Sequence, residues 1–123
     1  MSRNLVTWKA PEWVPENIEV PNSKVKLANT PTPIESWDLT SLGFEFPIFI
    51  KRDDLTGSSL TGNKVRKQEF LIADAIKKGC DSIIAWGSAT SNHCRTTALC
   101  CARMGLECHL LLSSSDKAVF RLG

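Results

Sequence analysis

The chain has 123 residues, of which 42% are hydrophobic and 23% charged, and its 15 basic and 13 acidic side chains give a formal net charge of +2. This is the length of one ordinary domain, and the apolar fraction excludes a wholly disordered chain. The small net charge, without a basic stripe, argues against nucleic acid as a partner.

The amino-terminal stretch, residues 1–43, is predicted to be an extended arm. It has little periodicity and contains five of the six prolines, which favour turns and extended backbone. A short helical turn is expected at residues 38–42, stopped by Gly43. The first residues lack the apolar middle of a secretory signal, and no apolar run approaches the roughly 20 residues that cross a bilayer. We therefore expect a cytoplasmic protein with no membrane partner.

Residues 44–112 are predicted to form a partial α/β domain. Strands alternating with helices are expected in the order 46–52, 63–78, 81–86, 94–104 and 107–112. Apolar strands that alternate with helices are typical of a parallel sheet covered on both faces. Two helices cannot easily cover both faces, so we expect the front part of a larger fold, followed by a divergent tail at residues 113–123.

The five cysteines are expected to be structural. Their number is odd and no Cys-x-x-Cys pair occurs, so neither a zinc site nor a redox dithiol is indicated. Three of them fall in the second helix, where a free thiol behaves as a small apolar side chain. The sequence therefore predicts no metal.

The loop that enters the first helix only approaches a phosphate-binding pattern. Gly57 and Gly62 have the required spacing, but Asn63 separates Gly62 from Lys64, and Val65 stands where a magnesium-binding hydroxyl is required. A nucleoside triphosphate site is therefore disfavoured.

Lys64, Arg66 and Lys67 crowd three cations into the first turn of this helix, the end at which the helix dipole disfavours positive charge. On one interpretation they simply point into solvent. On the other, neighbouring cations and partial burial favour the neutral amine of Lys64, as a lysine that attacks a carbonyl group requires.

A second polar loop, residues 87–93, follows the next strand and opens the second helix. Its hydroxyls, carboxamide and backbone N–H groups suit an anion, and ligands of open α/β sheets bind at the carboxyl ends of strands. Helix capping by Ser91 or Asn92 explains only one of the polar side chains between Thr90 and His93. The two loops together predict a cofactor pocket.

Three motifs resemble the D-cysteine desulfhydrase / 1-aminocyclopropane-1-carboxylate (ACC) deaminase family. They are Lys51-Arg52-Asp53-Asp54, Gly62-Asn63-Lys64-Val65-Arg66-Lys67-Gln68-Glu69-Phe70 and Ser91-Asn92-His93-Cys94-Arg95. The resemblance covers residues 47–112 and implies a partial three-layer parallel sheet of the tryptophan-synthase-β-like (fold type II) enzymes. It also implies pyridoxal 5'-phosphate as cofactor and a small amino acid as substrate. The implied activity is a lyase or deaminase that converts D-cysteine to pyruvate, sulfide and ammonia; the alternative is ring opening of ACC.

The resemblance also implies roles for individual residues. Lys64 would bind the cofactor covalently and move protons, and Asn63 and Asn92 would also bind the cofactor, Asn92 at the phenolic oxygen of its ring. Ser91 would be catalytic, and the substrate-binding residues would be Thr90, Ser91, Asn92 and His93. His93 is similar to the desulfhydrases, whereas Thr90 departs from the glutamine common in the family.

The resemblance implies that part of the site is missing. Family members are a few hundred residues long, and their phosphate cup and substrate-facing tyrosines lie in the later part, whereas this chain has no tyrosine. We therefore expect a truncated form with little or no β-elimination activity by itself. A hypothesis of another class is a non-catalytic binding module, whose incomplete sheet is covered by a second copy or by a full-length relative.

Overall fold

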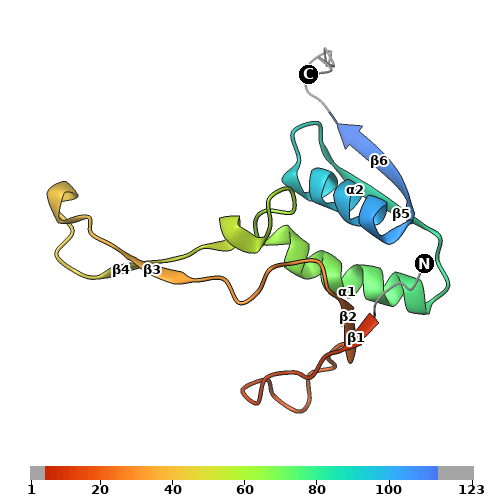
Figure 1. Ribbon diagram of the computed structural model, residues 1–123, viewed down its shortest axis with the longest axis horizontal. Coiled ribbons are helices and arrows are strands. Elements are labelled where there is room, and N and C mark those ends of the chain that lie inside the picture. Colours follow the sequence, from red (N-terminus) through yellow and green to blue (C-terminus); the bar gives the residue numbers. More distant parts are fainter. Residues whose placement is uncertain (1–4, 114–123) are drawn as a thin grey trace.

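The computed structural model describes residues 5–113, in which two helices lie side by side and six strands form three separate pairs (Figure 1). The elements in chain order are β1 (Leu5–Thr7), β2 (Ser23–Val25), β3 (Ile34–Trp37), the 3-10 helix η1 (Thr40–Leu42), β4 (Ile48–Lys51), the 3-10 helix η2 (Asp53–Thr56), α1 (Lys64–Lys77), β5 (Ser82–Ser88), α2 (Asn92–Met104) and β6 (Glu107–Ser113). No helix of the described part is long and apolar enough to span a membrane. The predicted tail lies almost wholly outside the described residues.

The carboxy-terminal half has the predicted α/β arrangement. Strands β5 and β6 are parallel, with Ala85 opposite Leu110 and Trp86 opposite Leu111. The connection between them is α2, which packs on one face of the pair. Gly105, just after α2, adopts φ +63°, a left-handed conformation that ends a helix at little steric cost in glycine. A parallel sheet with a helical crossover confirms the predicted fold class.

Strand β4 differs from the expectation for residues 46–52. It pairs antiparallel with β3 instead of joining the parallel sheet, with Ile34 opposite Lys51 and Trp37 opposite Ile48. Its partner β3 lies in the stretch expected to be an arm, directly after two prolines, and no strand was predicted there. The short η1 turn stands between the two strands and ends at Gly43, as predicted. Figure 1 shows that this β3–β4 ribbon extends well away from the helices.

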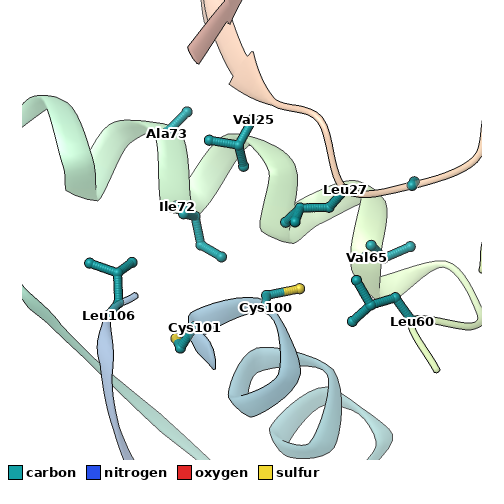
Figure 2. Close-up of a cluster of buried hydrophobic side chains, with 10 residues drawn as sticks. Val25, Leu27, Leu60, Val65, Ile72, Ala73, Cys100, Cys101 and Leu106 are labelled. Carbon is teal, nitrogen blue, oxygen red and sulfur yellow. The ribbon is translucent and has the colours of Figure 1, made fainter. Parts of the chain in front are cut away.

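The hydrophobic core lies around the two helices and includes part of the amino-terminal stretch. Ile72 of α1 is fully buried and points toward Cys101 of α2, whereas Val25 and Leu27 cover the other side of α1 (Figure 2). The stretch expected to be an extended arm therefore supplies core side chains. The division of the chain at residues 43 and 112 stays a prediction.

Glu69 explains why the amino-terminal stretch stays on α1. Its carboxylate is buried, and Oε1 accepts hydrogen bonds from the backbone N–H groups of Leu27 (2.8 Å) and Ala28 (2.9 Å). Oε2 forms an ion pair with Lys24 Nζ at 2.7 Å. A buried carboxylate is tolerated only when it is compensated in this way, so these bonds fix the crossing of residues 24–28 over α1.

All five cysteines are free thiols, and Cys94, Cys100 and Cys101 are buried. Burial raises the pKa of the Cys100 thiol to about 11 and that of Cys101 to about 12. Buried, protonated thiols are poor nucleophiles, which agrees with a packing role. Among the residues described here, no group of three or more histidine, cysteine, aspartate or glutamate side chains could hold a metal ion.

Candidate functional site

The first candidate residue, Lys64, begins α1. Asn63 stands at the N-cap position, but its side chain makes no capping hydrogen bond. Lys64 is half-buried. The ion pairs of α1 use Arg66, Glu69 and Asp74; within residues 5–113 none uses the Lys64 amine, which also makes no hydrogen bond there.

A buried hydroxyl shapes the loop that leads to Lys64. Thr56 Oγ1 lies 2.9 Å from the carbonyl oxygen of Asp53, 3.0 Å from that of Leu60 and 3.2 Å from that of Gly62. The Gly62 N–H closes the loop by donating to the Asp53 carbonyl at 2.8 Å. Gly62 has φ +87°, which favours glycine, so the turn into α1 depends on this residue.

The second candidate loop joins β5 to α2. Ser91 is the N-cap of α2, and its Oγ accepts a hydrogen bond from the Cys94 N–H at 3.3 Å. Gly87 allows this arrangement because a Cβ at that position would lie 2.7 Å from Ser91 Oγ and 2.9 Å from Cys94 Sγ. The end of β5 and the first turn of α2 are therefore packed as closely as the backbone permits.

Gly87→Ala is expected to destabilise the protein by about 1–3 kcal/mol, because the added methyl group displaces Ser91 from its capping position. Urea unfolding of the purified chain measures the change. Gly57→Ala is the matched control, since a Cβ there would meet no heavy atom closer than 3.4 Å. Equal stability of the two variants would contradict the close packing inferred at Gly87.

Arg95 hydrogen-bonds the loop before α1 to the start of α2. Its guanidinium donates to the Ser59 carbonyl at 2.8 Å, to Asn92 Oδ1 at 2.6 Å and to Thr61 Oγ1 at 3.4 Å. Since Arg95 holds Oδ1, the Nδ2 donor of Asn92 is turned toward the first loop, where a Cβ on Gly62 would lie 3.4 Å from it. Arg95 belongs to the third sequence motif but was assigned no role there, although its spacing of three residues from Asn92 on a helix indicates contact.

A buried hydrogen bond aligns the two helices. Gln68 Nε2 of α1 donates to Thr97 Oγ1 of α2 at 2.8 Å, and the helices run in the same direction (Figure 1). Lys64 and His93 each lie four residues earlier, which is one helical turn back on the same face. This places Lys64 and His93 at the same end of the helix pair as Asn92.

The remaining candidates, Thr90 and Ser91, line a hollow of about 370 Å³ between the start of α2 and β6. Asn92, Arg95 and residues of β6 also line this hollow, but Lys64 does not. Asn92 therefore lines this hollow with Thr90 and Ser91 and also lies beside Gly62, two residues before Lys64.

The arrangement fits a group that carries a carbonyl carbon and an anionic oxygen. The half-buried Lys64 amine makes no hydrogen bond within residues 5–113, so it is not engaged there and can add to an aldehyde when unprotonated. The Asn92 Nδ2 donor, held in place by Arg95, can donate to an oxygen beside that aldehyde. Pyridoxal 5'-phosphate carries both groups on neighbouring ring atoms, so the residues present fit it.

Comparisons with known proteins agree with this chemistry. Residues 25–122 match the family model described as pyridoxal-phosphate dependent enzyme. The bifunctional D-cysteine desulfhydrase/1-aminocyclopropane-1-carboxylate deaminase, mitochondrial, of Arabidopsis thaliana is 43% identical over 108 residues, which is 88% of this chain and 27% of that protein. A D-cysteine desulfhydrase of Salmonella paratyphi B is 44% identical over 91 residues, which is 74% of this chain and 28% of that protein.

A crystal structure of an ACC deaminase homologue superposes with a TM-score of 0.69 at 39% sequence identity. The superposition covers 78% of this chain and 29% of that one. The chain thus spans little more than a quarter of the length of the relatives that it matches.

Proposed function

Because the chain belongs to the family of pyridoxal-phosphate-dependent enzymes, we propose that it carries the cofactor-binding lysine and asparagine of a D-cysteine desulfhydrase site. The observation that carries this proposal is that Arg95 hydrogen-bonds both to the loop before Lys64 and to the side chain of Asn92. It brings the half-buried Lys64 amine and an oriented amide donor to the same helix ends, which motif order alone cannot do.

Each residue has a role in this proposal. Pyridoxal 5'-phosphate, when bound, supplies the electron sink for carbanion chemistry. Lys64 Nζ holds the cofactor and carries a proton to and from the α-carbon of the substrate. Asn92 Nδ2, with Asn63 beside Lys64, binds the cofactor ring. The hydroxyls of Thr90 and Ser91 and the His93 ring bind the amino-acid substrate, and the N–H groups at the start of α2 attract its carboxylate.

D-Cysteine is the proposed substrate, with sulfide, pyruvate and ammonia as products. ACC is the alternative, because one relative is named for both activities and the structural relative for the ACC deaminases. The complete reaction requires the parts of the family fold that lie outside the aligned quarter. A cytoplasmic location and association with a second copy or with a full-length relative belong to the same proposal.

Cofactor binding and turnover test the proposal together. We expect the purified chain to bind pyridoxal 5'-phosphate saturably in equilibrium dialysis, with one cofactor per chain. Sulfide and pyruvate released from D-cysteine, and 2-oxobutanoate released from ACC, are then measured beside the full-length Salmonella relative. Turnover is expected to be far below that of the relative, and absence of saturable binding would overturn the proposal.

A binding module is the second candidate function, and the uncovered face of β5–β6 favours it. On this face Ile84 is 69% exposed, Trp86 74% and Leu111 60%, and neighbouring apolar side chains of this exposure mark an interaction surface. Light scattering of the purified chain, combined with the cofactor-binding measurement above, tests the module, because association without cofactor binding fits the module alone. Dimers, or complexes with an added full-length relative, support the module, whereas a monomer that forms no complex counts against it.

A further inference from the structure

Asp53 contacts the chain on both sides of Lys64. Its carbonyl oxygen accepts the Gly62 N–H at 2.8 Å. Its carboxylate accepts two hydrogen bonds from the guanidinium of Arg66, at 2.8 Å from Nη2 and 3.0 Å from Nε. A single residue therefore holds both the residue two positions before Lys64 and the residue two positions after it.

Thr32 adds a third connection to this cluster. It is buried, its Oγ1 donates to Asp53 Oδ1 at 2.8 Å, and it accepts from Arg66 Nη2 at 3.0 Å. The Arg66 guanidinium holds the pKa of the Asp53 carboxyl below its usual value, so the carboxylate stays ionised at neutral pH. Asp53 thus binds the Gly62 N–H, the Thr32 hydroxyl and the Arg66 guanidinium.

The start of α1 lacks the usual local stabilisation. Asn63 makes no capping bond, and the first turn contains no acidic residue while carrying Lys64, Arg66 and Lys67. Cations in the first turn are unfavourable to the helix dipole, and an uncapped N-terminus is more easily frayed. A carboxylate outside the helix that binds Arg66 offsets the first of these effects.

We propose that Asp53 is a positioning residue for Lys64. Through Gly62 and Arg66 it fixes the backbone on both sides of the lysine, and so holds the amine at the end of the helix pair where Asn92 lies. The inference rests on the proposed function of Lys64 for its purpose, but the positioning itself is a property of residues 62–66. Removal of the Asp53 carboxylate is expected to loosen this segment and to leave the core folded.

Asp53→Asn and Asp54→Asn form a matched pair for the test. Asp54 also binds an arginine through two nitrogens, with Arg52 Nη2 and Nε at 2.7 and 2.9 Å, but it is exposed and makes no described bond to residues 62–66. Amide hydrogen exchange by NMR reports the opening of the Gly62 N–H, which donates to the Asp53 carbonyl at 2.8 Å. We expect exchange there to rise about tenfold or more in Asp53→Asn and to stay unchanged in Asp54→Asn.

Asp53→Glu is the rescue variant. It restores the negative charge, so amide exchange is expected to slow part of the way back to the rate of the parent chain. It also serves if Asp53→Asn fails to fold. The reaction of each variant with pyridoxal 5'-phosphate, trapped by borohydride and mapped to Lys64, is expected to follow the exchange rates. Unchanged exchange at the Gly62 N–H in a folded Asp53→Asn protein would overturn the positioning role. Loss of protection without any labelling of Lys64 in the parent chain would instead refute the proposed function and leave the positioning intact.

Discussion

Lys64→Ala is expected to abolish the absorbance band near the visible edge that forms when pyridoxal 5'-phosphate is added to the chain. The band requires a covalent bond between the cofactor aldehyde and an amine, and Lys64 is the half-buried amine at the end of the helix pair where Asn92 lies. Noncovalent contacts with Asn92 would survive, so weakened cofactor binding without the band is the expected residual behaviour.

Lys67→Ala is the matched control for this loss. Lys67 lies in the same first turn and carries the same charge, but it is exposed. Removing it changes the charge at the start of α1 as much as removing Lys64 does. A band that persists in Lys64→Ala, or that disappears equally in both variants, would contradict the assignment of Lys64.

Glu69→Ala is expected to lower the free energy of unfolding by about 3–5 kcal/mol, because removing one partner of a buried ion pair leaves the rest uncompensated. The groups left without their acceptor are the Lys24 amine and the N–H groups of Leu27 and Ala28. This loss is a large fraction of the total stability of an ordinary domain.

Urea unfolding of Glu69→Ala and Asp74→Ala measures the difference. Asp74 lies on the same helix and pairs with Lys78 at 2.7 Å, but both side chains are more than half exposed. Its removal should cost no more than about 0.5 kcal/mol, as is usual for an exposed pair on a helix. A Glu69→Ala protein as stable as Asp74→Ala would show that the amino-terminal stretch is held by its apolar side chains alone.

Local sequence patterns predict the carboxy-terminal half of the fold well. Helix periodicity followed by glycine places the ends of α1 and α2, since Gly79 and Gly105 adopt the positive φ that such ends need. The apolar runs that become β5 and β6 are bounded by polar loops and have the length of strands. These signals are contained within a few neighbouring residues.

The pairing of β3 with β4 was not predictable in the same way. Ile34–Trp37 follows two prolines and is only four residues long, so it carries no strand signal of its own. Its hydrogen bonds to β4 depend on a partner more than ten residues away. The attachment of residues 24–28 to α1 likewise depends on Glu69, which is more than 40 residues distant. Long-range partners of this kind leave little trace in composition or periodicity.

The site residues stay a prediction, and the sequence indicates where they lie in the fold more than which contacts they make. Motif order places two polar loops at the starts of two helices, and the structure brings their residues to the same end of the helix pair. The role of Arg95 depends on how residues 59–61 pack against the start of α2. The role of Asp53 depends on the path that the loop takes to Gly62. Neither follows from spacing, because both depend on how a loop without regular structure closes.

The most direct test of the central claim is reductive trapping. The chain is incubated with limiting pyridoxal 5'-phosphate, reduced with borohydride and digested, and the modified lysine is located by mass spectrometry. Lys64 is expected to carry most of the label at low cofactor concentration. Label spread evenly over exposed lysines such as Lys67 and Lys77 would show that the amine at the start of α1 has no special reactivity, and the account would fail.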